Sequence, residues 1–378
     1  MIQKILFICP EPNRTGAPIL LLNLLKWLKL NSTISFDILL LTKGELESDF
    51  KNVSSTYQLE YVTNQTLIKR ILYRLVQKKS NKKELIESWL RKTFKNKGYT
   101  HIFGNTILSA DVLLQMSKMY PNSKLLLHIH ELQNQTFKFK SQLDDLLSKN
   151  LHIIAVSKLT RDNLLFNHNI KSSSISLVYE YIDISNILSY SQQVSTNAEY
   201  FTVNSSGSVQ SRKGYDIFIL IAFRCVQKFP NVPFRFRWIG NIHPDLLFLI
   251  KHDLESTGLS EIVEFIGLQK NPYNEYQKGD VFLLTSRLDP FPLVCLEHAL
   301  LKKPIVCFDK GTGITEFVES DAGIIVTYLD IDAVADALFM LYQNTSIRSK
   351  ITEVAYRKVQ NYDVNYKAKE ILNIILNA

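Results

Sequence analysis

Short apolar runs alternate with longer amphipathic segments along almost the whole chain. Continuous apolar runs of strand length indicate buried strands, and apolar positions three or four residues apart indicate helices. The predicted strands span residues 5–9, 36–41, 58–62, 101–104, 124–129, 153–156, 174–178, 200–204, 234–239, 263–265, 281–285, 305–308 and 323–326. Predicted helices between them span residues 17–30, 107–119, 216–229, 245–255, 293–301 and 331–341. This alternation is typical of βα units and predicts an α/β fold with parallel sheets.

Residues 180–198 interrupt the alternation, because they are polar and rich in Ser and Asn. We interpret this segment as a linker between two domains. The predicted organisation is a first domain at 1–182, a linker at 183–198, a second domain at 199–360 and a final helix in 361–378. Two successive open α/β domains form a cleft between the carboxyl ends of their sheets, where ligands bind in such folds.

Composition supports a globular protein of two domains. The 378 residues are 46% hydrophobic and 21% charged, close to the globular average, so the sequence excludes wholesale disorder. The four cysteines, Cys9, Cys225, Cys295 and Cys307, lie far apart in apolar runs, which predicts buried free thiols. No signal peptide and no apolar run of about 20 residues is visible. We therefore expect a cytoplasmic protein that binds a membrane at most at its surface.

Several enzyme classes are disfavoured by missing motifs. Neither half has GxGxxG after its first strand, which disfavours a nicotinamide-dependent dehydrogenase, and the absence of GxxxxGK[ST] disfavours a P-loop ATPase. No HExxH motif or Cys/His cluster with metal-ligand spacing occurs, so we expect no metal site.

The most informative segment spans residues 286–300 and follows the predicted strand 281–285. Pro292 fits the first turn of a helix, where its missing N–H costs nothing. The preceding loop therefore ends at a helix N-terminus whose free N–H groups point into the predicted cleft. Two carboxylates flank this point: Asp289 lies on the loop, and Glu297 follows on the helix after seven intervening residues.

A carboxylate, seven residues and Glu, followed by a small apolar helix and Lys303-Pro304-Ile305-Val306, resembles the acidic signature of the group 1 (family four) retaining glycosyltransferases. The resemblance covers nearly the whole chain. Further similar segments are Arg14-Thr15-Gly16-Ala17, Ala155-Val156-Ser157, Gly207-Ser208-Val209-Gln210-Ser211-Arg212-Lys213-Gly214, Trp238-Ile239-Gly240 and Gly279-Asp280-Val281. The resemblance implies the GT-B fold, in which two Rossmann-like domains face each other across a cleft and a C-terminal helix crosses back to the first domain.

The resemblance also implies roles for individual residues. A nucleotide-sugar donor, a substrate rather than a cofactor, would place its diphosphate against Lys213 and Arg212 at a helix start, where positive charge eases departure of the leaving group. Glu297 would bind the ribose hydroxyls, Asp289 the sugar hydroxyls, and His130 would lie near the sugar. The remaining implied donor contacts are Gly16, Phe291, Pro292 and Leu293. His130, Asp289 and Lys213 are the implied catalytic residues, and no metal is required.

Each of these residues also has an ordinary structural interpretation. Glu297 could be a solvated helix residue, Asp289 a helix cap, and Lys213 a surface lysine. His130 competes with His128 on the same strand face. Ser208 stands where the family often has Arg, so Arg212 or Arg287 would have to supply the second positive charge.

The sequence leaves three functional hypotheses open. The first is a retaining glycosyltransferase that uses a saccharide or lipid-linked acceptor in surface polysaccharide or glycolipid synthesis. The second is a nucleotide-sugar epimerase or a phosphorylase with the same fold. The third is a catalytically weak GT-B subunit that binds a partner transferase.

The positive charge is concentrated in one segment. The chain has a formal net charge of +8, and residues 66–98 alone contain eleven Lys or Arg against two Glu, so the remainder is almost neutral. Apolar residues recur at helical spacing there, including Trp89, Leu90 and Phe94. This pattern predicts either a basic amphipathic helix pair on an anionic membrane or an ordinary surface helix pair. Nucleic acid is disfavoured, because no recognition-helix or base-stacking motif is present.

Overall fold

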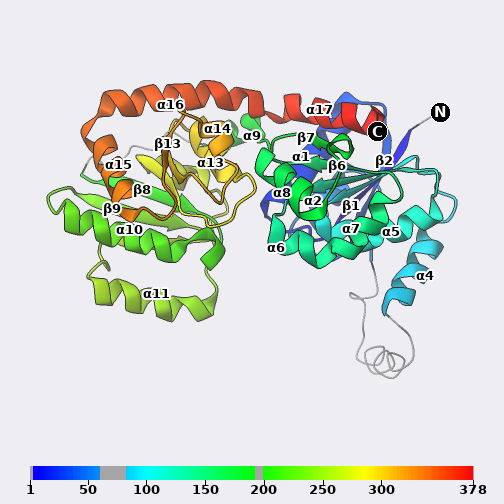
Figure 1. Cartoon of the computed structure of the whole chain (residues 1–378), viewed down its shortest axis with the longest axis horizontal. Coiled ribbons are helices and arrows are strands. Elements are labelled where there is room, and N and C mark those ends of the chain that lie inside the picture. The colour runs from blue at the N-terminus through cyan, green and yellow to red at the C-terminus, as the bar shows by residue number, and fades with distance from the viewer. Residues whose placement is uncertain (1–2, 60–81, 192–198, 378) are drawn as a thin grey trace. The chain divides into compact units, whose positions relative to one another are not determined.

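The computed structural model describes residues 3–59, 82–191 and 199–377, and the chain divides into two compact units. The first unit contains Met1–Val156, Thr160–Val178 and Lys367–Ala378, and the second contains Ser157–Leu159 and Tyr179–Tyr366. Both units are α/β, as the alternating pattern predicts (Figure 1).

Among the described residues, the first unit holds a seven-stranded parallel sheet in the order β3-β2-β1-β4-β5-β6-β7. Its strands are β1 (Lys4–Cys9), β2 (Ser35–Leu40), β3 (Thr56–Gln58), β4 (His101–Asn105), β5 (Lys124–Ile129), β6 (Leu151–Ala155) and β7 (Ile175–Leu177). The order reverses between β1 and β4, which pair with each other. Such a reversal creates a ligand-binding crevice at the carboxyl ends of the two strands.

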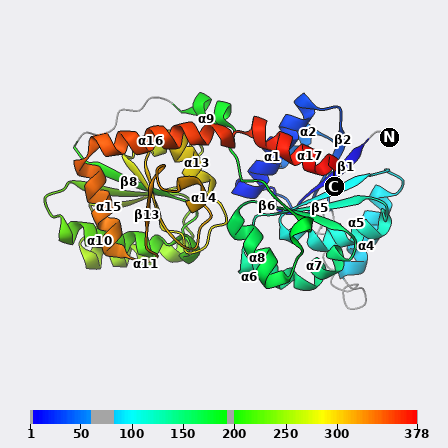
Figure 2. The same ribbon diagram turned by 45° about the horizontal axis from the view of Figure 1, so that its top comes forward.

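Helices cover both faces of this sheet, which explains why the central strands are apolar throughout. They are α1 (Gly16–Asn31), α2 (Glu47–Val53), α4 (Lys82–Phe94), α5 (Ala110–Met119), α6 (Gln133–Thr136), α7 (Lys140–Leu147) and α8 (Lys158–His168), with short 3₁₀ turns at Ile107–Ser109, Phe137–Phe139 and Ser172–Ser174. Helices α1 and α2 lie on one face, and α5 and α7 lie on the other (Figure 2).

The second unit holds a six-stranded parallel sheet in the order β10-β9-β8-β11-β12-β13, counted over its described residues. Its strands are β8 (Phe201–Ser206), β9 (Phe234–Ile239), β10 (Val263–Gly267), β11 (Val281–Leu284), β12 (Ile305–Phe308) and β13 (Ile324–Val326). The order reverses between β8 and β11, which are neighbours in the sheet. The second unit therefore has a switch point of the same kind as the first.

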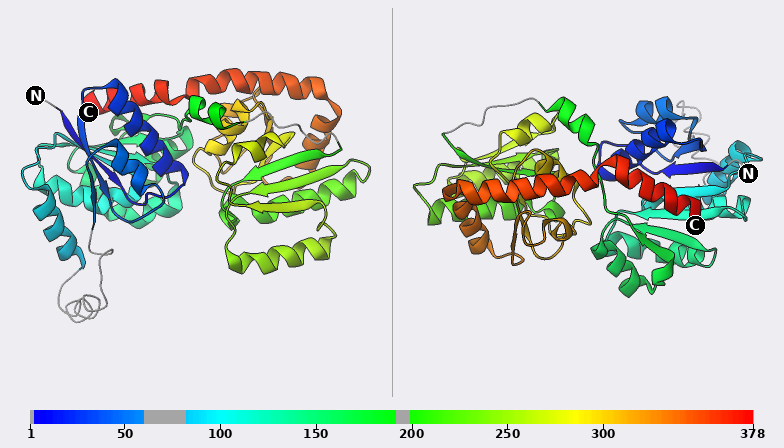
Figure 3. Two further views of the ribbon diagram at one scale, coloured as in Figure 1. Left: turned by 180° about the vertical axis from the view of Figure 1, so that it is seen from behind. Right: turned by 90° about the horizontal axis from the view of Figure 1, so that it is seen from above.

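The helices of the second unit follow its strands closely. They are α9 (Ile184–Tyr190), α10 (Tyr215–Lys228), α11 (Pro244–Thr257), α12 (Tyr273–Gln277), α13 (Leu293–Leu300), α14 (Thr315–Val318), α15 (Ile331–Gln343) and α16 (Thr345–Val359), with 3₁₀ turns at Ser211–Lys213 and Gln360–Tyr362. The last helix, α17 (Val364–Asn377), begins in this unit and continues into the first. Helices α10 and α15 pack side by side against one face of the sheet, and α13 packs on the other face against α16 (Figures 1 and 3).

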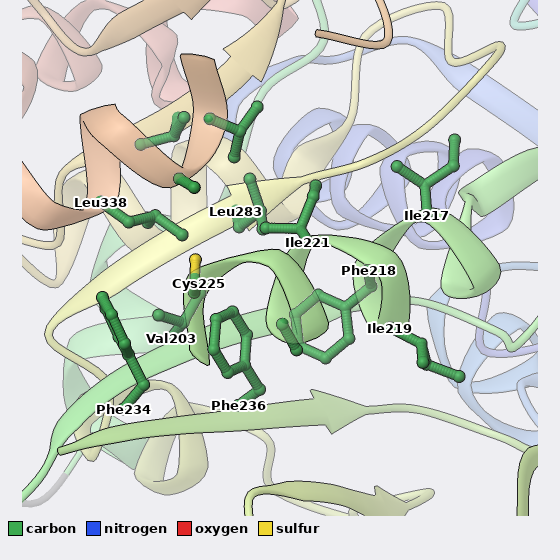
Figure 4. Packing of buried hydrophobic residues seen from close by; sticks show 14 of the residues in the cluster. Val203, Ile217, Phe218, Ile219, Ile221, Cys225, Phe234, Phe236, Leu283 and Leu338 are labelled. Carbon is green, nitrogen blue, oxygen red and sulfur yellow. The ribbon is translucent and has the colours of Figure 1, made fainter. Parts of the chain in front are cut away.

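The core of the second unit lies between α10 and the sheet. Phe218 packs edge-on against Phe236 of β9, with ring centroids 5.5 Å apart. Ile221 and Cys225 continue the same face of α10 towards Leu338 of α15 (Figure 4). Each fully buried side chain of this size stabilises the fold by roughly 1.5–3 kcal/mol, so α10 is held firmly. This matters because the residues just before α10 form the candidate site.

Most predicted strands are confirmed within two residues, and the predicted C-terminal helix is confirmed as α17. From Lys367 onward this helix belongs to the first unit, as expected for a helix that crosses back. Part of the predicted linker is helical, because Asp183 accepts a hydrogen bond from the Asn186 N–H and caps α9. All four cysteines are buried and free, as predicted.

The basic segment is only partly described, because residues 60–81 lie outside the described ranges. In α4, Leu90 and Phe94 are fully buried in the core of the first unit, and Trp89 packs beside them. The apolar face of α4 therefore packs on its own domain, as in an ordinary surface helix, and Arg91 and Lys92 are exposed near its end. Within the described ranges, no helix is long and apolar enough to cross a membrane.

Candidate functional site

At the switch point of the second unit, the loops that follow β8 and β11 bring four polar side chains together. The Nζ atom of Lys213 donates a hydrogen bond to Oδ2 of Asp289 at 2.5 Å, and the Ser286 hydroxyl donates to the same oxygen at 3.2 Å. The Arg212 guanidinium lies 4.0 Å from it. We call Arg212, Lys213, Ser286 and Asp289 the switch-point cluster. Asp289 is almost fully buried, so these neighbours fix the orientation of its carboxylate.

Glycines shape the loop that follows β8. Gly207 has a φ of +136°, and a Cβ atom there would contact the aliphatic stem of Lys213 at 3.4 Å. The carbonyl of Gly207 accepts a hydrogen bond from Nε1 of Trp238 at 2.8 Å. A Cβ on Gly240 would lie 2.1 Å from that same carbonyl oxygen. Trp238 and Gly240 therefore fix the Gly207 loop, which in turn sets the path of the Lys213 side chain.

Helix α10 begins immediately after this loop. Gly214, with a φ of +76°, lies between Lys213 and the first helical residue, and a Cβ there would lie 2.1 Å from the Thr285 carbonyl oxygen. The Thr285 hydroxyl donates to the Lys213 carbonyl at 3.0 Å. Lys213 is thus held at the N-terminus of a 14-residue helix, where the helix dipole favours an anion. The Asp216 carboxylate in the first turn already accepts from the N–H groups of Asp216 and Ile217.

The loop that follows β11 is fixed by its backbone. The Asp289 N–H donates to the Gly311 carbonyl at 2.7 Å, and the Gly313 N–H donates to the Asp289 carbonyl at 3.1 Å. Gly311 has a φ of +81°, and a Cβ there would lie 2.1 Å from the Arg287 carbonyl oxygen. Asp289 does not cap α13; Pro292 precedes that helix as its N-cap residue, one position earlier than expected.

The Phe291 side chain is buried against two tyrosine rings. Its ring is 1% exposed and packs against Tyr179 and Tyr362, with centroids 5.2 Å and 5.9 Å away. A ligand could therefore meet Phe291 only through its backbone. Pro292 is also buried and Leu293 is half-buried. These three residues would therefore contact a ligand through their backbone at the start of α13, not through their side chains.

The second positive charge of the site belongs to Arg212. Arg287 binds Asp216 in a bidentate ion pair at 2.6 and 2.8 Å, and this contact raises the Arg287 pKa. Arg212 instead donates to the Leu288 carbonyl at 2.6 Å and leaves nearly half of its side chain exposed. Of the two arginines considered from the sequence, Arg212 is the one beside Lys213 and Asp289.

Glu297 lies one turn inside α13, beside two tyrosines. Burial raises the Glu297 pKa to about 7, although part of the residue reaches the surface. Its negative charge contributes to the raised pKa values of Tyr273 and Tyr276, after their own burial. The Tyr276 hydroxyl lies 2.8 Å from the Ser206 hydroxyl at the end of β8. Glu297 thus faces the same edge of the sheet as the loop after β8, and it is not a fully solvated helix residue.

A third carboxyl group, Glu180, interacts electrostatically with the switch-point cluster. Glu180 is 7% exposed. Burial is the main cause of its raised pKa, the charge of Asp289 raises that pKa further, and Lys213 lowers it. Glu180 begins the polar segment 180–198, and nothing in the local sequence indicates its neighbours.

In the first unit, the candidate residues lie at the carboxyl ends of β1, β4 and β5. Nε2 of His130 lies 3.2 Å from Oδ1 of Asn105, and the Asn105 amide nitrogen donates to the Ala17 carbonyl at 3.1 Å. Asn105 thus links His130 to the first turn of α1, which begins at Gly16. Asn105 itself was not singled out from the sequence, because a lone Asn at a strand end has no distinctive pattern.

The rings of His128 in β5 and His130, just after that strand, pack against each other with centroids 4.1 Å apart. Burial lowers the His130 pKa to about 3, so its ring is neutral near pH 7. Burial and the charge of His130 lower the His128 pKa well below its ordinary value. The Glu131 carboxylate accepts from the backbone N–H groups of His130 and Ile107, so it holds this loop through the main chain.

The predicted residues therefore form groups within each unit. Lys213, Arg212 and Asp289 share one cluster, and Glu297 lies beside tyrosines at the same sheet edge; Gly16 and His130 are linked through Asn105 in the first unit. No group of three or more potential metal ligands occurs among the described residues. The arrangement offers positive charge and helix N–H groups to an anion, with carboxylates beside them to accept hydrogen bonds from hydroxyls.

Comparison with known proteins finds a family match within the second unit. Residues 201–344 match the family model described as "Glycosyl transferases group 1". D-inositol 3-phosphate glycosyltransferase of Corynebacterium urealyticum is 27% identical over 175 residues, which cover 44% of this chain and 41% of that protein. Poly(glycerol-phosphate) alpha-glucosyltransferase of Bacillus subtilis is 28% identical over 114 residues, which cover 30% of this chain and 17% of that protein. The chain thus matches less than half the length of these relatives.

Comparison with solved structures extends the similarity to the whole fold. The crystal structure of Anabaena Alr3699/HepE in complex with UDP superposes with a TM-score of 0.77 at 19% identity, covering 100% of both chains. The same protein has also been solved with UDP-glucose. At this identity the likeness establishes the fold, which is GT-B.

Proposed function

We propose that the protein is a retaining glycosyltransferase, because residues 201–344 match the group 1 glycosyltransferase family model and the whole chain has the GT-B fold. It moves a sugar, of the hexose class, from a nucleotide-sugar donor to a saccharide or lipid-linked acceptor. The observation that supports this best is the switch-point cluster, where Lys213 and Arg212 stand at a helix N-terminus beside a buried carboxylate.

The first step in our proposal is recognition of the donor diphosphate. Lys213 and Arg212, at the N-terminus of α10, meet two phosphate groups with fixed positive charge. The same groups stabilise the negative charge that develops when the bond between sugar and phosphate breaks. Because this charge is supplied by the chain, we propose that no metal ion or other cofactor is needed.

The carboxylates then orient the donor's hydroxyl groups. Glu297 lies beside Tyr273 and Tyr276 near the end of β8, and we assign it to the ribose hydroxyls. Asp289, already fixed by Lys213 and Ser286, is assigned to the hydroxyls of the transferred sugar. Gly16 and the start of α13 at Phe291, Pro292 and Leu293 complete the donor contacts through their backbones.

We propose retention of configuration by a front-face route. The sugar passes through an oxocarbenium-like state while the departing phosphate oxygen takes the acceptor's proton. His130 lies near the sugar as a neutral ring and donates or accepts hydrogen bonds without carrying charge. The alpha-glucosyltransferase among the relatives is consistent with retention, since common nucleotide sugars are themselves alpha-linked.

For the acceptor, we propose a surface polysaccharide or glycolipid intermediate, with the enzyme working in the cytoplasm at an anionic membrane surface. Arg91, Lys92 and Lys95 are exposed on or next to α4 and provide the charge for this contact. Because the apolar face of α4 is buried in its own domain, the proposed contact is electrostatic.

The test of the function is a thermal-shift screen against UDP-, GDP-, ADP- and TDP-sugars, followed by transfer of labelled sugar from the best binder into a lipid and saccharide extract. A nucleotide sugar that raises the melting temperature and labels the extract supports the proposal. A protein that no nucleotide sugar stabilises, or that consumes donor by epimerising it, contradicts it.

A further inference from the structure

We propose that Asp216 and Arg287 are further positioning residues of the donor site: their ion pair holds the two cations of the switch-point cluster in place for the donor diphosphate. This inference rests on the proposed function, because it concerns the same site. Neither residue has to touch the donor, since both act through the cations that they hold.

The Arg287 side chain contacts the chain on both sides of Lys213. Its Nη1 and Nη2 atoms donate to Oδ1 and Oδ2 of Asp216 at 2.8 and 2.6 Å, so the contact is two-pronged. Nη1 also donates to the Ser211 carbonyl at 2.6 Å. In the chain, Ser211 lies just before the two cations and Asp216 lies just after them. One guanidinium therefore fixes both ends of the segment that carries Lys213.

Further hydrogen bonds tie the same segment to the loop that follows β11. The Arg212 carbonyl accepts from the Arg287 N–H at 2.8 Å. The Lys213 carbonyl accepts from the Thr285 hydroxyl at 3.0 Å. With the Ser211 carbonyl, successive carbonyl groups of the segment are thus bound to one partner loop. A change in how Arg287 is held would therefore displace the backbone of both cations.

Asp216 fixes the Arg287 guanidinium from the side of α10. Its carboxylate lies in the first turn of that helix and accepts from the N–H groups of Asp216 and Ile217. The helix thus orients the carboxylate, and a guanidinium that meets both of its oxygens has a defined orientation. The hydrogen bond from Arg287 is the main cause of the lowered Asp216 pKa, so the pair is charged near pH 7.

The ion pair is partly exposed, with 32% of the Arg287 side chain and 41% of the Asp216 side chain accessible to solvent. An exposed ion pair stabilises a fold only slightly. We therefore expect the pair to matter little for stability. We expect a larger effect on donor binding, because a small displacement of a group that binds a ligand changes its interaction strongly.

The experiment measures binding of the nucleotide sugar selected by the thermal-shift screen, by calorimetry, to Asp216→Asn and to Arg287→Lys. Asp216→Asn removes the ion pair together with a negative charge close to the site. Charge alone would tighten diphosphate binding in this variant, whereas loss of the positioning contact weakens it. Arg287→Lys keeps the positive charge, but an ammonium cannot reproduce the planar contact with both carboxylate oxygens and the Ser211 carbonyl.

The matched controls are Arg224→Lys and Asp332→Asn. The Arg224 guanidinium binds the Asp332 carboxylate at 2.6 Å, and both side chains are partly exposed. Arg224 also lies on α10, so these variants weaken a comparable ion pair of the same helix away from the loop that precedes it.

We expect Asp216→Asn and Arg287→Lys each to raise the dissociation constant on the order of three- to tenfold, with melting temperatures close to that of wild type. Both controls should bind the nucleotide sugar as wild type does. An unchanged or lower dissociation constant in either site variant would overturn the inference, and so would an equal loss of affinity in the controls. A site variant that is unfolded at the titration temperature would also overturn it, because the pair would then be a support of the fold. Failure of wild type to bind any nucleotide sugar would instead contradict the proposed function itself, and the inference with it.

Discussion

The Nζ atom of Lys213 lies 2.5 Å from Oδ2 of Asp289, although the two residues are 76 positions apart in the chain. They meet because β8 and β11 are neighbours at the point where the strand order reverses. The ammonium therefore has a partner before any donor arrives, and its charge is held in place at the start of α10. A preorganised charge of this kind stabilises a departing diphosphate without reorganising during the reaction.

Replacing Lys213 with Ala should lower kcat/KM by about 100- to 1000-fold, the loss typical for one preorganised electrostatic contact at a reacting centre. Asp289→Asn should also reduce turnover, because an amide cannot pair with the Lys213 ammonium. The measurement is steady-state kinetics, with circular dichroism to check the fold. Lys251→Ala, an exposed lysine on α11, serves as the control and should keep wild-type turnover. Wild-type kinetics in both site variants would contradict the assignment.

Gly240→Ala should abolish donor binding and destabilise the protein, because a Cβ there would lie 2.1 Å from the Gly207 carbonyl oxygen. Gly258→Ala is the matched control, since Gly258 also has a positive φ but nothing lies within 4 Å of its added Cβ. The control should cost only about 1–2 kcal/mol of unfolding free energy from backbone strain. Denaturant unfolding and calorimetry measure both effects. Equal losses in the two variants would show that contact with the Gly207 loop is unimportant.

Glu297 should make donor binding depend on pH, because its pKa is raised to about 7 and the ionised form is the better acceptor for ribose hydroxyls. Its contribution should increase as the pH rises through 7. Glu297→Gln should remove this increase, as calorimetry from pH 5.5 to 8 would measure. An unchanged rise in affinity in the variant would exclude Glu297 as its source.

The same raised pKa predicts an effect on stability. The folded protein holds the Glu297 proton more tightly than the unfolded chain, whose Glu pKa is near 4.3. The stabilisation that comes from binding this proton is fully present below the unfolded-state pKa and is lost as the pH rises through about 7, the folded-state pKa. The melting temperature of Glu297→Gln relative to wild type should therefore be higher at pH 8 than at pH 4. A relative melting temperature that falls over this range would show that the carboxylate is stabilised by the fold.

Removal of divalent metals should leave activity unchanged, since we assign the diphosphate charge to Lys213, Arg212 and the start of α10. The measurement is turnover after dialysis against EDTA, with and without added Mg²⁺ or Mn²⁺. Activity lost on dialysis and restored by either ion would contradict this assignment.

Exchanging Arg91, Lys92 and Lys95 for Gln should reduce binding to phosphatidylserine vesicles, because each surface cation contributes about 1 kcal/mol to such contacts. A control variant with Lys251, Lys350 and Lys369 exchanged for Gln has the same net charge as the α4 variant. Vesicle co-sedimentation at two salt concentrations measures the difference. Wild type that remains in solution with these vesicles at low salt would exclude the membrane contact.

The sequence predicted the strands well because buried parallel strands are apolar on both faces, as in β1 and β11, and this pattern is local. It also indicated the Asp289 and Glu297 pair, since both residues lie in one strand–loop–helix unit. Helix α16 was missed because its apolar positions are few among charged and polar ones. β3 was predicted at 58–62, and the structure has it at Thr56–Gln58; residues 60–62 lie outside the described ranges.

Other features of the site could not be predicted, because they depend on contacts between distant segments. Glu180 stands in a polar stretch, yet it is buried next to Tyr179, whose ring packs on the distant Phe291. Arg212 and not Arg287 supplies the second positive charge of the site, because Asp216 forms an ion pair with the Arg287 guanidinium. Asn105 acquires its importance from two partners in different segments, His130 and Ala17.

The central claim is that a nucleotide sugar binds the second unit through Lys213. Calorimetric titration of wild type and Lys213→Ala with the nucleotide sugar chosen by the thermal-shift screen tests it most directly. We predict saturable binding to wild type and a dissociation constant raised by at least tenfold in Lys213→Ala, which should still melt cooperatively. Equal affinity in the two proteins would contradict the claim.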